Sequence, residues 1–328
     1  MMLTQIQAPP VPPAGEAIMP DTTGFGEGLL TLIGNAVAAI HPDLRDAAGI
    51  CMSLIAVILL VSIVGLIPGA KLKTAELIGA VGIGTILLQR ANSMIHLGIR
   101  TIEELSGYGK LLLPAMTSAM AAQGGVTAST ALYAGTALFD AILTSLVTRL
   151  ITPMVYIFLV LCTANAALGE DLLKKMADFV KWLSGWILKI ILYIFTGYMG
   201  ITGVISGATD AAALKAAKLT ISGVVPVVGG ILSDASEAVL VSAGMVRNAA
   251  GIYGILAILA VFLTPFLRIG CHYLLLRLTG AVCAVFGVKR CSELISQFSA
   301  AMGLELAMTG SVCLLQLIST VCFLRGVG

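Results

Sequence analysis

The sequence predicts an all-α polytopic integral membrane protein with about six to eight transmembrane helices and two broken or re-entrant segments. The 328 residues are 58% hydrophobic and only 11% charged, whereas a soluble globular domain carries roughly 25% charged residues. Several apolar stretches reach the roughly 20 residues that a helix needs to cross a bilayer. The 36 glycines suit closely packed or interrupted helices, both of which are frequent in membranes.

The N-terminal part is predicted to lie outside the membrane core. Residues 1–23 contain five prolines and no Lys or Arg, so they lack the basic start and apolar centre of a signal peptide and are expected to form a disordered tail. In residues 24–45, apolar side chains recur at helical spacing, which predicts an amphipathic helix at the membrane surface. Residues 46–328 are expected to form one polytopic membrane domain.

Apolar stretches in that domain are long enough to span a bilayer. One predicted span, at 269–288, carries Arg277 near its middle and is expected to form a helical hairpin with the span at 299–324. The other predicted spans are 48–67, 77–99, 150–168, 183–206, 250–267 and 299–324.

Two regions, 111–140 and 218–251, fit poorly as simple spans. Each contains a proline, then a glycine pair, then a run of small and hydroxyl residues. Backbone groups that Pro and Gly free from hydrogen bonding cannot face lipid, so both regions are predicted to be broken helices or re-entrant hairpins. The predicted helix breaks are Pro114, Gly124, Gly125, Pro226, Gly229 and Gly230.

Basic residues in the loops give a hypothesis for orientation. If both broken regions re-enter from one side, the loops at 71–73 and 174–181 share the opposite side. Short cytoplasmic loops are enriched in Lys and Arg, so that opposite side is expected to be cytoplasmic.

Ionisable residues inside predicted spans are each unfavourable by about 2.5–3.5 kcal/mol, so they must be paired, hydrated or functional. The plainer interpretation is that they pair with one another across helices. The alternative is a function in the membrane. These residues are Arg90, Asp140, Arg149, Lys189, Arg247, Arg277 and Glu305.

Acids and bases are densest between residues 210 and 247. Asp234 and Glu237 are three residues apart and so share a helix face, just after the predicted break at Gly229. A new helix start favours a carboxylate, so Asp234 either caps the second half-helix, with Ser233 as a competing cap, or lines a polar path through the membrane. The candidate lining of that path is Asp210, Lys218, Ser233, Asp234, Glu237 and Arg247.

Enzyme motifs are missing from the sequence. It has no serine-protease GxSG, no nucleotide-binding GxxxxGK[ST], no HExxH and no GxGD pattern. The seven cysteines form no CxxC motif and are expected to pack as small apolar residues. We therefore expect no catalytic residue, metal or cofactor, and the net charge of +2 gives no sign of nucleic-acid binding.

Three ordered stretches carry a resemblance to a known family. They are "LLLPAMTSAMAAQGGVTAS", then "TDAAALKAAKLTISGVVPVVGGILSDASEAVLVSAGMVRNAAGIYG", then "LTPFLRI". Together they resemble the stage III sporulation protein AE family of endospore-forming bacteria, over roughly residues 44–324. The family's basic-Asn-x-x-Gly ending falls here on Arg247, Asn248 and Gly251, which adds Asn248 to the candidate polar lining.

The resemblance implies membership of the channel-like complex that joins the mother cell to the engulfed forespore. Members of that family sit in the mother-cell membrane around the forespore, beside ring-forming proteins and a cytoplasmic ATPase, and have no established catalytic residue. Three functions follow as hypotheses. The chain is an export gate or permease whose broken segments line the conduit, a non-conducting assembly scaffold, or an ion-coupled secondary transporter.

Overall fold

The computed structural model describes residues 9–20, 25–65, 67, 72–122, 126–201 and 249–326. The regular structure of these residues is helical, which confirms the all-α prediction. In chain order the helices are α1 (Pro13–Glu16), α2 (Phe25–Ala39), α3 (His41–Gly65), α4 (Leu72–Ala122), α5 (Val126–Leu146), the π-helical turn η1 (Val147–Ile151), α6 (Thr152–Leu168), α7 (Asp171–Ile201), α10 (Ala249–Ala284) and α11 (Lys289–Gly326).

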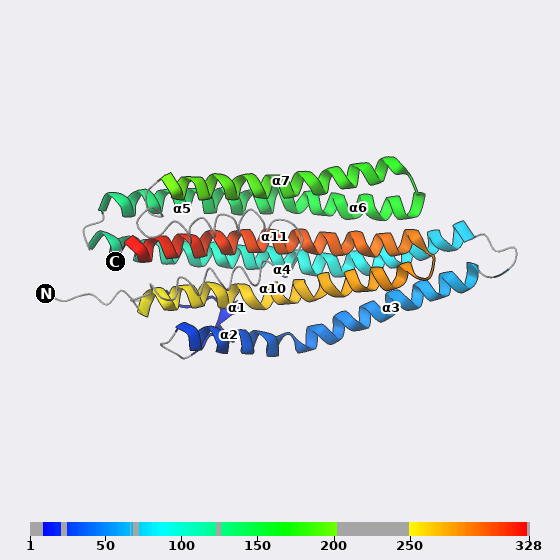
Figure 1. The fold of residues 1–328 in the computed structure, drawn as a ribbon, viewed down its shortest axis with the longest axis horizontal. Coiled ribbons are helices and arrows are strands. Elements are labelled where there is room, and N and C mark those ends of the chain that lie inside the picture. The colour runs from blue at the N-terminus through cyan, green and yellow to red at the C-terminus, as the bar shows by residue number, and fades with distance from the viewer. Residues whose placement is uncertain are drawn as a thin grey trace.

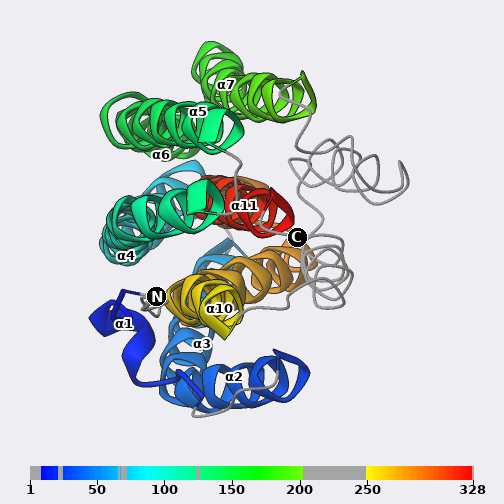
Figure 2. The ribbon, with the colours of Figure 1, turned by 90° about the vertical axis from the view of Figure 1, so that its left-hand side faces the viewer.

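The long helices run side by side along one axis of the molecule (Figure 1). Seen end-on, they stack in layers: α5, α6 and α7 lie on one side, α4 and α11 in the middle, and α10 and α3 on the other side, with α2 outermost (Figure 2). α10 and α11 form a hairpin whose turn includes Gly287, with a φ of 79° that residues other than glycine rarely adopt. The core is this pair of helices, with α4 packed along α11.

Among the described residues, five segments are long and apolar enough to cross a membrane, which confirms a polytopic membrane protein. The predicted span 77–99 lies in α4, which is not one of the five. The predicted span 183–206 lies in α7 as far as Ile201, and its last residues are outside the described part of the chain. The five segments are His41–Gly65, Ser129–Leu168, Asp171–Met199, Gly251–Ala284 and Lys289–Leu324.

The predicted spans 250–267 and 269–288 are one helix, α10, with 36 residues and a length of about 54 Å. The two predicted spans meet at Arg268, where a charge interrupts the apolar pattern. In the structure, Nη2 of Arg268 lies 2.6 Å from Oδ2 of Asp43 at the start of α3. This ion pair compensates the charge, so the helix continues through Arg268. The predicted hairpin with the last span is confirmed as α10 and α11.

The predicted break at Pro114 is wrong, because Pro114 lies inside α4 and the helix continues to Ala122. Proline removes one backbone N–H and crowds the carbonyl group four residues earlier. Membrane helices tolerate this where neighbouring helices pack around the site. Leu112 and Leu113, just before the proline, are both buried in the core, so this turn of α4 is supported by packing.

The region 111–140 forms the adjoining ends of α4 and α5, two long helices that run antiparallel (Figure 1). Residues 123–125, with the predicted breaks Gly124 and Gly125, lie outside the described residues. The other predicted breaks also lie outside them, namely Pro226, Gly229 and Gly230.

The first described segment, residues 9–20, packs against the bundle and is not the free N-terminal tail that its prolines predict. α1 contacts α10, where a Cβ atom at Gly15 would lie 2.9 Å from the backbone nitrogen of Val261. Ile18 is buried, and its carbonyl oxygen accepts a hydrogen bond of 3.3 Å from Nδ2 of Asn35. The start of the described chain therefore belongs to the folded core.

The predicted surface helix 24–45 is divided at Ile40, since α2 ends before this residue and α3 begins after it. α2 packs against α10, buries Leu32 and exposes Leu30. Its exposed surface is mixed, since the apolar Leu30 lies beside the polar Glu27 and Thr31.

Candidate functional site

A group of hydrogen-bonded polar side chains is enclosed in the apolar core where α4, α5 and α11 meet. Its centre is Asp140 of α5, which is 3% exposed. Oγ of Ser106 in α4 donates a hydrogen bond of 2.6 Å to Oδ2 of Asp140, and Nε2 of Gln316 in α11 donates one of 2.7 Å to Oδ1. One turn away, Oγ1 of Thr136 donates to Oγ of Ser319 at 3.1 Å. We call these five residues the central seam.

Helical periodicity and one glycine bring the central seam together. Its two residues on α5 are four apart and its two on α11 are three apart, so each pair lies on one helix face. On α4, Gly109 lies one turn from Ser106 and directly against the Gln316 side chain, where a Cβ atom would collide with the amide. Glycine here lets α4 approach α11 closely.

Asp140 has a donor on each carboxyl oxygen, and Lys110, one turn beyond Ser106 on α4, lies near enough for an electrostatic interaction but not for an ion pair. Among the described residues, no Lys, Arg or His lies within ion-pair distance of it. An acid inside a membrane bundle is rare and usually marks an ion pathway, a substrate pathway or a proton relay. The carboxyl, hydroxyl and amide groups of the seam can exchange their mutual hydrogen bonds for bonds to water or a polar solute.

A second acid, Glu305, lies further along the same α4–α11 contact. It is 0% exposed, and its Oε2 faces Gly98 of α4, where a Cβ atom would be 2.5 Å away. Neither carboxyl oxygen has a hydrogen-bond partner among the described residues. Since Glu305 precedes Gln316 by about three helical turns, the two buried acids are separated by about 16 Å along the bundle.

Among the described residues, neither intramembrane acid forms an ion pair with one of the predicted intramembrane bases. Asp140 is bound by neutral donors, and Glu305 has no partner among the described residues. Of the predicted bases, Lys189 is half-buried and Arg247 lies outside the described residues. The exposed bases are Arg90, Arg149 and Arg277.

The polar lining predicted from the sequence lies wholly outside the described residues. The structure therefore neither places these side chains nor brings them to the central seam. They are Asp210, Lys218, Ser233, Asp234, Glu237, Arg247 and Asn248.

Ser106 and Gln316 belong to the site but are not among the residues that the sequence predicts for it. The available signal for Gln316 is a lone amide in the apolar run "SVCLLQLIST". Ser106 carries no comparable signal, because serine is common in membrane helices and its hydroxyl often bonds to its own backbone.

A second polar cluster lies where α3 begins beside α10. Nδ1 of His272 is 3.0 Å from the carbonyl oxygen of Arg268, whose guanidinium group pairs with Asp43. His272 and Arg90 also line a small, mostly apolar cavity between α3, α4, α10 and α11. The Arg268–Asp43 ion pair joins α10 to α3, whereas Nε of Arg268 and Nε2 of His272 have no hydrogen-bond partner among the described residues.

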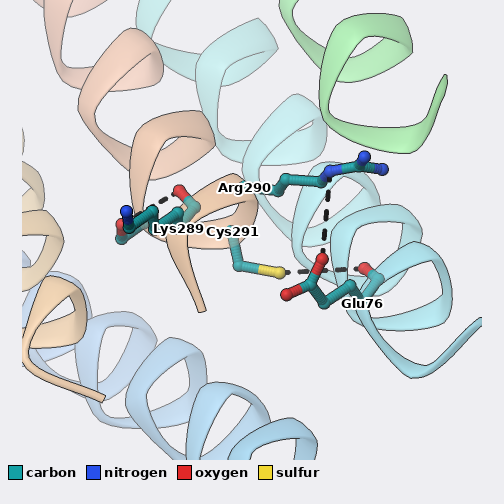
Figure 3. A network of polar contacts seen from close by, with 5 residues as sticks. Glu76, Lys289, Arg290 and Cys291 are labelled. Carbon is teal, nitrogen blue, oxygen red and sulfur yellow. Dashed lines mark hydrogen bonds and ion pairs between the residues drawn. The ribbon is translucent and has the colours of Figure 1, made fainter. Parts of the chain in front are cut away.

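Ion pairs gather at the end of the bundle where α10 turns into α11. Nζ of Lys174 in α7 lies 2.6 Å from Oε1 of Glu293 in α11. Nε of Arg290 lies 3.8 Å from Oε2 of Glu76 in α4, and Sγ of Cys291 lies 3.8 Å from the carbonyl oxygen of Glu76 (Figure 3). Such partly exposed pairs add little stability, but they bring basic residues of α7 and α11 to one end, which we call the basic end.

A family model and a curated relative both relate the chain to stage III sporulation protein AE. The family model described as stage III sporulation protein AE matches residues 37–325. The chain is also similar to the stage III sporulation protein AE of Bacillus subtilis (strain 168), with 22% identity over 220 residues, or 65% of this chain. The alignment covers 55% of that relative, so the chain spans little more than half of its length. No solved structure matches the chain.

Proposed function

Because the chain belongs to the stage III sporulation protein AE family, we propose that it is a membrane component of the complex that links mother cell and forespore. Its role there is that of a permease-like or gate subunit needed for late forespore development. The proposed role is not enzymatic. A role in sporulation itself follows from family membership.

The observation that carries the proposal is the central seam. In a bundle this apolar, a packed hydrophobic core is sufficient for folding, and a buried acid without a close ion pair is unfavourable. The seam places such an acid, Asp140, with hydroxyl and amide groups from three helices. Separation of α4 from α11 would turn these groups toward a polar path.

The proposed location is the mother-cell membrane around the forespore, with the basic end of the bundle in the mother-cell cytoplasm. Lys and Arg are enriched in short cytoplasmic loops, and Lys174 and Arg290 both lie at the basic end. The proposed partners are other membrane and ring-forming proteins of the stage III complex, and a cytoplasmic ATPase would dock at the basic end.

A scaffold role is the second candidate, and one observation favours it. The five residues of the central seam are buried and hydrogen-bonded to one another. A network with satisfied partners can serve to fix how helices pack. In that case the seam stays closed and no solute reaches it.

Cysteine accessibility separates the two roles. In a chain whose seven native cysteines have been replaced, Thr136→Cys and Ser319→Cys are made singly and treated with a membrane-impermeant thiol reagent in vesicles from sporulating cells. The matched control is Leu138→Cys, which lies on the same helix as Thr136 but on its exposed apolar face.

A conduit predicts that both seam cysteines are labelled while the control in lipid is not. A scaffold predicts no labelling at either seam position, although an exposed cysteine at Lys175 in the same vesicles is labelled. The second result would reject the permease-like role.

A further inference from the structure

Glu305 is enclosed where α11 meets α4 and α6, and the central seam does not use it. None of its surface is exposed, and among the described residues neither carboxyl oxygen has a hydrogen-bond partner. Buried polar groups are nearly always hydrogen-bonded, so one without a partner calls for its own explanation.

The surroundings of Glu305 provide packing and no counter-charge. A Cβ atom at Gly98 would lie 2.5 Å from Oε2, so the carboxyl group fills the space that a side chain would take. The hydroxyl of Thr309 donates to the backbone carbonyl of Glu305 at 2.9 Å. Tyr156 of α6 lies close enough for an electrostatic interaction, but its hydroxyl donates to Oδ1 of Asn92 at 2.7 Å.

Charged groups on the packed helices do not pair with Glu305. None of the described Lys, Arg or His residues forms an ion pair or hydrogen bond with its carboxyl group. An ionised Glu305 would hold an uncompensated charge in a medium of low polarity, which is strongly unfavourable. The titratable and charged residues on the middle turns of the helices around Glu305 include Arg90, His96, Arg100, Glu103 and Glu104 on α4, Asp140 on α5, Arg149 on η1, Tyr156 on α6, Lys189 on α7, and Arg268, His272 and Tyr273 on α10.

We propose that Glu305 is a proton-binding site in the bundle. The carboxyl group holds a proton while α4 is packed against α11, and it releases the proton when their contact at Gly98 loosens and admits water. Release breaks the O–H bond, passes the proton to water and leaves a carboxylate that water solvates. The contact between α4 and α11 at Gly98 thus determines whether Glu305 keeps or releases its proton.

The use of this site rests on the proposed permease-like role. In this role α4 and α11 must separate for the bundle to open. Because the proton site lies between them, proton binding is coupled to that opening. The proton favours the closed packing, and its release favours the open one. Proton binding can be measured without any assay of transport, so it is tested separately.

Infrared spectroscopy of the full chain in lipid vesicles tests proton binding directly. A protonated carboxyl group has a carbonyl stretch that is separate from carboxylate bands and shifts on exchange into D₂O. At neutral pH we expect this band in the wild type and its loss in Glu305→Gln. The matched control, Glu293→Gln, removes a partly exposed, ion-paired acid and should remove carboxylate absorption instead.

The proposal is overturned if Glu305→Gln removes carboxylate absorption and leaves the carboxylic acid band unchanged. If the glutamine variant does not accumulate, Glu305→Met supplies an uncharged side chain of similar length for the same comparison.

Spore yield tests whether release of the proton matters. Glutamine fixes the neutral form, so Glu305→Gln should fold and assemble but lose heat-resistant spores, whereas Glu305→Asp keeps a titratable group and should retain more of them. Wild-type spore counts from the glutamine variant would overturn the coupling. Labelling of cysteines in the central seam tests the permease-like role separately, so that role can stand if the proton site fails.

Discussion

At Asp140, one of the two donors comes from Gln316, and this hydrogen bond links α11 to α5. Gln316→Met keeps the length of the side chain and removes the donor. A buried acceptor that loses its donor costs about 1–3 kcal/mol. We expect the free energy of unfolding in mixed micelles to fall by about that amount.

The control is Thr320→Val, one turn along α11. Thr320 is buried, but its hydroxyl donates to the backbone carbonyl of Gln316 at 2.8 Å, within its own helix. Loss of such a bond changes helix stability only slightly. If Thr320→Val and Gln316→Met lower the free energy of unfolding equally, the hydrogen bond to Asp140 contributes no more to stability than a bond within α11.

Asp234, outside the described residues, keeps the two roles that the sequence assigns to it. Asparagine can cap a helix but carries no charge. If Asp234 lines a conduit, Asp234→Asn should leave insertion and assembly intact and lower spore yield, and Asp234→Leu should also impair folding. If the asparagine variant sporulates normally and cysteines at positions 230 and 234 are not labelled from the aqueous side, the conduit role of Asp234 is excluded and the capping role remains.

The sequence identifies the two buried acids but not their surroundings. Asp140 and Glu305 stand out because acids are rare in apolar stretches. The partners of Asp140 are 34 and 176 residues away along the chain, so they depend on how the helices pack. For the same reason, the sequence suggests a base as the partner where the structure has a hydroxyl and an amide.

At the scale of the helices, two glycines of α4 test the close approach to α11. A Cβ atom at Gly109 would collide with the amide of Gln316, whereas nothing lies within 4 Å of one at Gly107. Gly109→Ala should lower stability by about 1–3 kcal/mol through overpacking. Gly107→Ala should raise it by roughly 0.5–1 kcal/mol, because alanine is the better helix former. Thermal unfolding of both variants checks this, and a stable Gly109→Ala variant would contradict it.

The number and ends of the helices were only partly predictable. Apolar length predicts the middle of α3, α7 and α11, but each helix begins before its predicted span, in a stretch that carries charged residues. The predictions fail at Pro114, which α4 accommodates, and at Arg268, which pairs with Asp43. In both places a local signal for a break is overridden by tertiary contacts that no single segment of sequence contains.

For the whole molecule, the proposed orientation can be checked at the basic end. Lys175 is exposed near the start of α7. In a chain without native cysteines, expressed in growing cells so that it lies in the surface membrane, Lys175→Cys should react with an impermeant thiol reagent in inverted vesicles and stay unlabelled in intact cells. Labelling of intact cells would reverse the orientation.

Deletion of the gene tests the role of the whole protein. The family relationship leads us to expect normal vegetative growth and forespores arrested after engulfment. Microscopy and counts of heat-resistant spores measure this outcome. A deletion strain that makes normal numbers of such spores would contradict a required role in sporulation.

The length of α10 has a mechanical consequence. This helix is about 54 Å long, whereas the hydrocarbon core of a bilayer is about 30 Å thick, and tilts of up to about 40° do not remove the excess. In the proposed orientation, with the basic end at the cytoplasmic surface, the surplus length projects from the opposite face of the membrane. The projecting part of the bundle acts as a lever arm, since a small change in helix tilt inside the bilayer displaces its far end by a larger distance.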